Sequence, residues 1–149
     1  MNKQRTAQNP SDFDKIAVPA CQYFLYQEIN SRITINVRFE DDDVWLTQLQ
    51  IAALFHTSRV NVVQHIRNIY KRSELQQERT CKDFLLVRKE GTRTVNRNVA
   101  HYSMDMIIAV GYRVNSPLAL QFRQWVAQRR KQIVVEKTKR EKSVIVTKK

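Results

Sequence analysis

The side chains best suited to chemistry in this sequence lie on one side of a predicted helix that begins after Ser58. Val62, Ile66 and Ile69 recur at helical spacing and predict its buried face. Arginine can form two hydrogen bonds with guanine, glutamine can form two with adenine, and valine can contact a thymine methyl group. We therefore expect this helix to lie in a DNA major groove. The expected base-contacting residues are Ser58, Arg59, Val60, Val63, Gln64 and Arg67, and the expected phosphate-contacting residues are Lys71 and Arg72.

The residues before this helix have the spacing of a helix-turn-helix motif. Thr47 and Gln50 form a capping-box pair, which predicts the start of a first helix. The small residue Ala52 lies ten positions before the apolar anchor Val62, as two closely crossing helices require. The turn position that glycine usually occupies is His56, and histidine is one of the residues enriched at positive φ. An ordinary helical hairpin with a polar outer face is the alternative interpretation.

A second group of basic residues surrounds a predicted hairpin turn. Apolar and β-branched residues at 84–87 and 94–99 flank Gly91, which can supply the positive φ of the turn. We expect this hairpin to act as a wing on the DNA backbone, with Arg93 and Arg97 among the DNA-binding residues. Arg88 and Lys89 lie in the same hairpin.

The sequence contains no convincing catalytic or metal-binding pattern, so we expect no enzymatic activity, no metal and no cofactor. The three histidines lack metal-ligand spacing, and two glycines cannot build a Gly-rich phosphate loop. The enzymatic alternative is DNA cleavage or joining by a tyrosine nucleophile, Tyr102 or Tyr112, with Arg113 and Arg123 on the phosphate. Tyr112 also fits an apolar helical face, which predicts a buried structural residue instead.

Positive charge is concentrated towards the C-terminus. The chain has 26 Lys and Arg residues against 14 Asp and Glu residues, a net charge of +12. Residues 129–149 hold nine basic and two acidic residues, which is more than half of the excess. Such a surface indicates a polyanionic partner, most commonly nucleic acid. We expect residues 136–149 to form a basic tail on DNA phosphates, and a merely solvated tail is the alternative.

Composition is typical of a globular cytoplasmic protein. A hydrophobic content of 42% and a charged content of 27% exclude wholesale disorder and a coiled-coil rod. No apolar run approaches the ~18 residues of a membrane-spanning helix, and residues 1–15 lack the apolar segment of a signal peptide. Cys21 and Cys81 have no CxxC partner, which indicates reduced thiols rather than disulfides.

The order of the predicted elements indicates an α+β fold. A β-hairpin of Tyr23–Ile29 and Arg32–Phe39, with Asn30 and Ser31 at its turn, precedes the helix-turn-helix, and the wing-like hairpin follows it. Two C-terminal helices are expected over 105–113 and about 117–135, the second with Ser116 as its N-cap and Pro117 at its first helical position. We expect a flexible arm at 1–20, a single DNA-binding domain at 21–135, and the tail at 136–149.

Several runs of residues resemble the RhuM family of bacterial virulence-associated proteins. These runs are Trp45-Leu46-Thr47-Gln48, His65-Ile66-Arg67-Asn68-Ile69-Tyr70, Glu74-Leu75, His101-Tyr102-Ser103-Met104-Asp105, residues 107–116 and Gln121-Phe122-Arg123-Gln124-Trp125. The resemblance spans about residues 23–133, and a weaker one exists to the N-terminal domains of phage and viral Bro-type antirepressors. It implies a DNA-binding regulatory protein. Family members usually continue further, whereas this chain departs into its basic tail after about Ile133.

Together these patterns predict a regulator of transcription that binds double-stranded DNA as a homodimer. A protein-interaction adaptor or antitoxin-like module, pairing through the hairpin edge of residues 23–39, is the main alternative. A DNA-cleaving or DNA-joining enzyme is the third reading.

Overall fold

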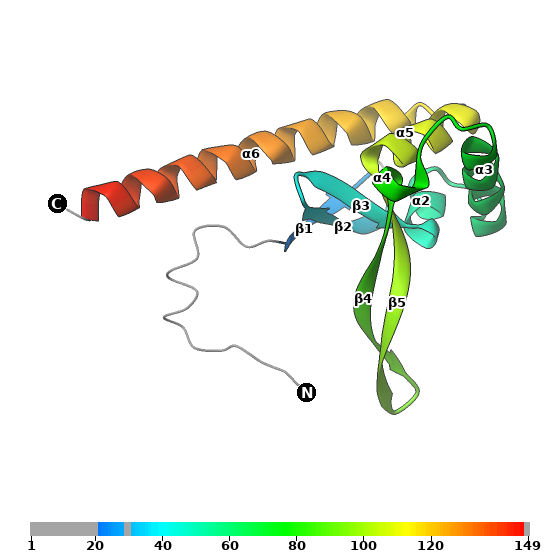
Figure 1. Ribbon diagram of the computed structural model, residues 1–149, viewed down its shortest axis with the longest axis horizontal. Coiled ribbons are helices and arrows are strands. Elements are labelled where there is room, and N and C mark those ends of the chain that lie inside the picture. The colour runs from blue at the N-terminus through cyan, green and yellow to red at the C-terminus, as the bar shows by residue number, and fades with distance from the viewer. Residues whose placement is uncertain (1–20, 29–30, 148–149) are drawn as a thin grey trace. The chain divides into compact units, whose positions relative to one another are not determined.

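The computed structural model describes residues 21–28 and 31–147, with side chains as far as residue 139 except residue 137 (Figure 1). The predicted arm at 1–20 and Asn30 of the predicted first turn lie outside this range. The mixed α+β class expected from the sequence is confirmed. The elements are β1 Cys21–Gln27, β2 Thr34–Glu40, β3 Asp43–Thr47, α2 Gln48–Leu54, α3 Arg59–Lys71, α4 Gln77–Thr80, β4 Cys81–Glu90, β5 Arg93–Ser103, α5 Met104–Arg113 and α6 Leu118–Thr147.

The five strands form one antiparallel sheet in the order β1-β2-β3-β5-β4. Both predicted hairpins are therefore present, and β3 joins them into a single sheet. This strand was not predicted, because its apolar run of Val44, Trp45 and Leu46 is too short to show a period. All three side chains are buried, so β3 lies in the centre of the core.

Alternation along β2 sets the buried face of the sheet. Ile35, Val37 and Phe39 are buried, as a period of two predicts. The first turns of α6 pack here: Tyr26 meets the rings of Phe122 and Trp125 edge-on at centroid distances of 5.2 and 5.1 Å. Buried aromatic pairs of this kind add about 0.5–1.5 kcal/mol beyond their buried area.

A glycine allows α5 to approach its neighbours closely. A Cβ atom added to Gly111 would lie 2.7 Å from the Ala119 Cβ and 2.9 Å from the Phe55 Cζ. The missing side chain thus lets α5 pack against both α6 and the end of α2. Tyr112, the next residue, is 72% exposed, so its assignment to the core is wrong.

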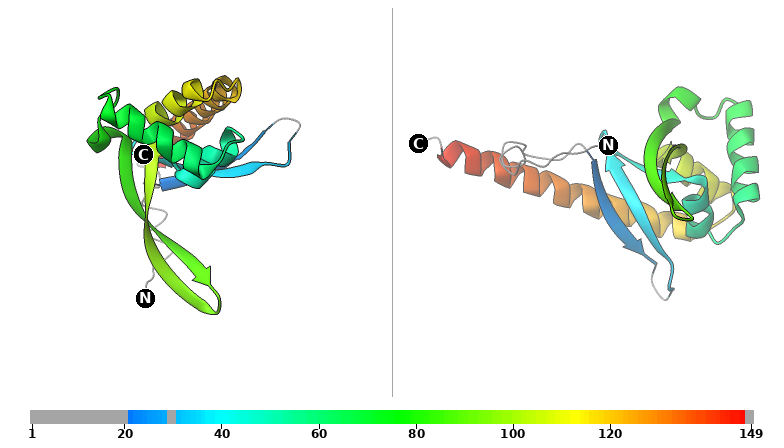
Figure 2. Two further views of the ribbon diagram at one scale, coloured as in Figure 1. Left: turned by 90° about the vertical axis from the view of Figure 1, so that its right-hand side faces the viewer. Right: turned by 90° about the horizontal axis from the view of Figure 1, so that it is seen from below.

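β4 and β5 continue beyond the sheet as a long two-stranded arm. Their pairing runs from Cys81 opposite Tyr102 to Glu90 opposite Arg93, whereas β3 pairs with β5 only at residues 101–103. Figures 1 and 2 show the free part of this hairpin as a twisted projection. Gly91 supplies the positive φ of its turn, +65°, as predicted. We call residues 84–99 the hairpin arm.

The chain divides into two units, of which the larger is Cys21–Val126 and the second includes the residues from Ala127 onward. Helix α6 starts within the larger unit and runs to Thr147, so the prediction that it ends near residue 135 is wrong. Charged residues along this stretch have good helix propensity, and the sequence has no glycine or proline there to end the helix. No helix within residues 21–28 and 31–147 is both long and apolar enough to cross a membrane.

Candidate nucleic-acid interface

Side-chain caps fix the two helices that present the candidate interface. The Thr47 hydroxyl accepts a hydrogen bond from the Gln50 backbone N–H at 3.2 Å, and the Gln50 side chain accepts one from the Thr47 N–H at 2.9 Å. The Ser58 hydroxyl accepts from the Asn61 N–H at 3.1 Å and so caps α3. Both predicted helix starts are confirmed. Ser58 is exposed but already has this structural role.

The turn between α2 and α3 has the conformation expected from its unusual histidine. His56 adopts φ +55°, and the Thr57 N–H bonds the Ala52 carbonyl across the turn at 3.0 Å. The His56 ring is held by Glu28, whose carboxylate is nearly buried and lies 2.9 Å from Nε2. The contact with Glu28 therefore stabilises a backbone conformation that is strained for histidine and that glycine would adopt without strain.

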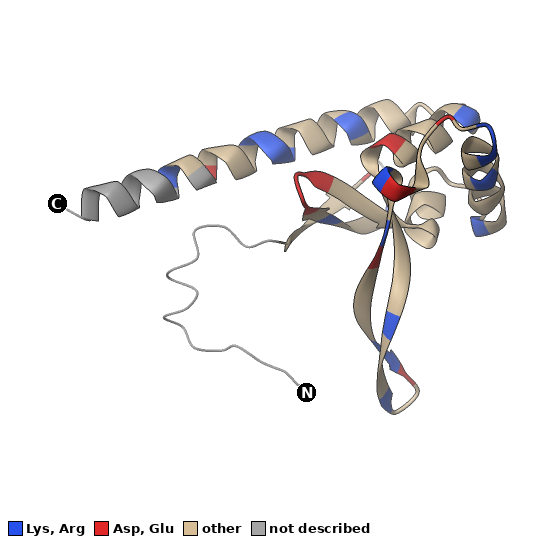
Figure 3. Ribbon diagram, viewed as in Figure 1, with Lys and Arg blue, Asp and Glu red and all other residues tan. Residues whose placement is uncertain are grey.

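Helix α3 is divided cleanly into a buried and an exposed side. Val62, Ile66 and Ile69 are buried, as predicted. The opposite side contains the predicted contact residues, of which Val60 is 78% exposed and Val63 is half-buried. The remaining exposed members are Arg59, Gln64, Arg67, Lys71 and Arg72. This side carries four basic residues and no acidic residue, and Figure 3 shows the helix as a blue-banded segment.

Gln48 contacts the predicted interface residue Arg59, although the sequence patterns did not single out Gln48 as a site residue. Its Oε1 accepts a hydrogen bond from the Arg59 Nε at 3.1 Å, and its Nε2 donates to the Tyr102 hydroxyl at 3.1 Å. Arg59 is thereby oriented while its two terminal nitrogens are not used by that contact. Nothing in the local sequence distinguishes Gln48 from an ordinary polar residue in a first helical turn.

The basic side chains of the hairpin arm differ in whether they form an ion pair. Arg97 donates to both carboxylate oxygens of Glu90 at 2.8 and 2.9 Å, and this hydrogen bonding lowers the pKa of Glu90. Arg97 thus already has an acidic partner, although it was predicted to contact DNA. Arg88, Lys89 and Arg93 are exposed, and none of them forms an ion pair with another residue of the described part of the chain.

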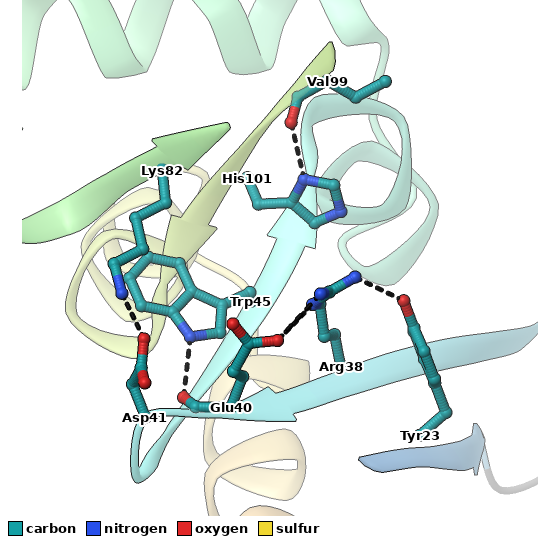
Figure 4. A network of polar contacts seen from close by, with 8 residues as sticks. All are labelled: Tyr23, Arg38, Glu40, Asp41, Trp45, Lys82, Val99 and His101. Carbon is teal, nitrogen blue, oxygen red and sulfur yellow. Dashed lines mark hydrogen bonds and ion pairs between the residues drawn. The ribbon is translucent and has the colours of Figure 1, made fainter. Parts of the chain in front are cut away.

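Two cations, Arg38 and Lys82, lie over aromatic rings at the base of the arm, and Figure 4 shows their polar contacts. The Arg38 guanidinium of β2 lies 3.9 Å from the centre of the Phe84 ring of β4. It also bonds the Glu40 carboxylate at 2.8 Å and donates to the Tyr23 hydroxyl at 2.6 Å. The Arg38 side chain therefore links β1 and β2 to the arm.

The second cation of this network is Lys82 of β4. It forms an ion pair with Asp41 and lies 5.2 Å from the centre of the Trp45 ring. Beside it His101 is buried, with Nδ1 donating to the Val99 carbonyl at 2.8 Å. Burial lowers the pKa of His101, which keeps its ring neutral near pH 7. These contacts fix the direction in which the arm leaves the sheet.

Two residues of the predicted tyrosine-nucleophile alternative, Tyr102 and Arg113, already have other hydrogen-bond partners. Tyr102 is buried and its pKa is raised by that burial. Arg113 bonds the Glu74 carboxylate at 2.6 Å. Over the described part of the chain, no three His, Cys, Asp or Glu side chains cluster where they could hold a metal ion. Cys21 and Cys81 are free and half-buried.

One part of the chain is similar to a known protein family. Residues 79–141 match the Virulence protein RhuM family. This match confirms, over those residues, the resemblance drawn from the sequence. It covers β4, β5, α5 and most of α6, and α3 lies outside it. It also continues past Ile133, so the predicted departure from the family there is wrong. No curated protein and no solved structure matches the chain.

Proposed function

We propose that this RhuM-related chain is a regulator that binds double-stranded DNA through α3. The observation that carries this proposal is the exposed side of α3, which is basic, rich in hydrogen-bond donors and free of carboxylates. A helix of 13 residues is about 20 Å long, and a major groove about 12 Å wide admits a helix.

The cap and turn geometry supports this role for α3. Both helix starts are capped, and Ala52, Val62 and Ile66 are buried between the helix pair and the rest of the core. A rigid helix can place side chains at base edges without a large ordering cost. Arg59 is the best candidate for guanine and Gln64 for adenine, because both are exposed on this helix.

The hairpin arm supports a second, sequence-independent contact. Arg88, Lys89 and Arg93 are exposed near its end, where they could neutralise backbone phosphates. Since the base of the arm is fixed by Arg38 and Lys82, the arm can act as a wing with a defined direction. We further propose a homodimer that reads two half-sites about one helical turn apart.

Selection from a random duplex library tests this function directly. The wild-type protein should enrich one motif with two related half-sites. Val60→Asp places a negative charge in the first turn of α3, on its exposed side, and should abolish enrichment, because phosphates repel it. Leu120→Asp, at an exposed position of α6, is the matched control and should enrich the wild-type motif. If wild type enriches no motif, α3 does not read DNA sequence.

A protein-interaction module is the second candidate, and the sheet edge favours it. β1 is an outer strand of the sheet, and its Tyr23 and Leu25 side chains are 47% and 63% exposed. Such an edge can pair with an extended partner segment. Under this alternative Val60→Asp leaves the protein's activity unaltered, whereas Leu25→Pro removes it.

A further inference from the structure

A groove beside α3 has the composition of an anion-binding site. It has a volume of about 550 Å³ and lies between the start of α2, α3, α4 and β5. Its polar walls consist of two cations, two carboxamides and two phenols. These residues are Arg67, Lys71, Gln48, Gln77, Tyr70 and Tyr102.

The two cations of the groove lack carboxylate partners in the described structure. No acidic residue lines the groove, and neither Arg67 nor Lys71 forms an ion pair among residues 21–28 and 31–147. Glu74, the acidic residue nearest to Lys71 in sequence, bonds Arg113 instead. An incoming anion would therefore meet two cations that no ion pair neutralises, although Glu78 and Asp83 lie near enough to act on Tyr70 and Tyr102.

The phenols keep the walls neutral. Burial raises the pKa of both Tyr70 and Tyr102, so neither is ionised at neutral pH. The Thr80 hydroxyl donates to the Gln76 carbonyl at 2.7 Å, and so Tyr70 must donate to Thr80 at 2.8 Å. That bond fixes the Tyr70 ring, which leaves the groove with an ordered aromatic wall.

The size and lining of the groove define the ligand. A volume of about 550 Å³ lies within the usual range for small-molecule sites and exceeds what one phosphate ion fills. Val63 and Ile66 add an apolar surface one helical turn before Arg67 and Tyr70. A phosphate joined to a flat ring matches this arrangement. The phosphate would form ion pairs with the two cations, and the ring would pack against Tyr70 and Val63.

We propose that this groove binds a single nucleotide unit, with its phosphate on Arg67 and Lys71 and its base against Val63, Ile66 and Tyr70. The carboxamides of Gln48 and Gln77 are then placed to bond the base or the sugar. The unit is either part of a bound strand, in which case the inference rests on the proposed function, or a free nucleotide.

Titration with adenosine monophosphate tests the groove in the absence of DNA. We expect chemical-shift changes at the Gln48 and Gln77 side-chain amides and at the Tyr70 ring. Arg67→Ala with Lys71→Ala should raise the dissociation constant at least tenfold, and inorganic phosphate or adenosine alone should bind more weakly. Arg123→Ala with Lys131→Ala removes the same charges at exposed positions of α6 and should change affinity less than twofold. The single variant Lys71→Gln gives a second reading if the double variant is unstable.

Three outcomes overturn the inference. They are the absence of shifts at the groove, shifts confined to other surfaces, and an equal loss of affinity in the α6 control, which would indicate attraction by net charge alone. Val60→Asp lies outside the groove lining and should still bind adenosine monophosphate, so failure of DNA binding and failure of the groove are distinguishable. Competition between adenosine monophosphate and a duplex would identify the unit as part of a bound strand. Independent binding of the two would identify it as a free nucleotide.

Discussion

At the residue scale, sequence patterns predict the conformation or burial of some side chains but not the polar contacts between residues far apart in the chain. The positive φ of His56 could be predicted from the missing turn glycine, but its contact with Glu28 could not, because 28 residues separate them. The burial of Val62, Ile66 and Ile69 could be predicted, since it follows from helical period. The exposure of Tyr112 could not, because its own helix is apolar on several sides.

Acidification should destabilise the fold through His101. Burial lowers the pKa of this ring in the folded state below its unfolded value, so the unfolded chain binds the proton first. The stability contribution is complete above the unfolded pKa, near 6.5, and is lost as the pH falls below it. Urea unfolding at pH 7 and pH 5 should show a smaller loss for His101→Asn, which retains a donor towards Val99, than for wild type.

His65 is the comparison residue for this measurement. Burial, followed by the charge of Arg113, lowers its pKa too, so His65→Asn should also reduce the acid sensitivity. Equal pH profiles for wild type and both variants would mean that neither ring is held neutral by the fold.

Gly111→Ala should destabilise the protein by about 1–3 kcal/mol, because its Cβ would overlap Ala119 and Phe55. Chemical unfolding measures the change. Gly91→Ala is the control: its Cβ meets no atom within 4 Å, so only the cost of a positive φ remains, about 1 kcal/mol. Similar unfolding midpoints for Gly111→Ala and wild type would show that α5 can shift away from α6.

At the element scale, long periodic segments could be predicted and short or paired ones could not. Helix α3, both hairpins and the cap residues of the helix pair follow from local signals. Strand β3 and helix α4 have too few residues to show a period, and β3 forms only because strands on both sides pair with it. The groove beside α3 draws on four elements, so no local pattern could indicate it.

The hairpin arm should contribute to the salt dependence of DNA binding. Arg88→Gln with Arg93→Gln should flatten the plot of log affinity against log salt by about 1–2 units, because each lost phosphate contact removes about 0.9. Arg79→Gln with Arg123→Gln, at exposed positions away from the arm, should leave the slope nearly unchanged. Equal slopes for the two double variants would show that the arm does not touch phosphate.

At the whole-molecule scale, charge is distributed unequally between the parts of the chain. Residues 129–149 carry nine basic and two acidic residues, and helix α6 continues through most of that stretch. The family match extends to residue 141 and so includes part of it. A basic helix can bind phosphates without reading bases.

Deletion of residues 136–149 should weaken specific and non-specific DNA binding alike. Six basic residues are removed, which sets an upper limit of roughly 5 units on the change in salt slope, and the two glutamates and partial occupancy make about 2–3 units the expected value. Titrations of a selected and a scrambled duplex at several salt concentrations measure both quantities. An unchanged slope would make this segment a solvated end, and a lost specificity ratio would mean that it positions α3.

The central claim is that α3 reads DNA sequence, and the ratio of affinities for a selected and a scrambled duplex tests it most directly. Arg59→Ala with Gln64→Ala removes two expected base contacts, each contributing about 1–3 kcal/mol of discrimination. Arg123→Ala with Gln124→Ala makes the same chemical change at exposed positions of α6. Our account predicts that the α3 variant loses at least tenfold in this ratio while the α6 variant retains the wild-type ratio. A wild-type ratio in the α3 variant would contradict it.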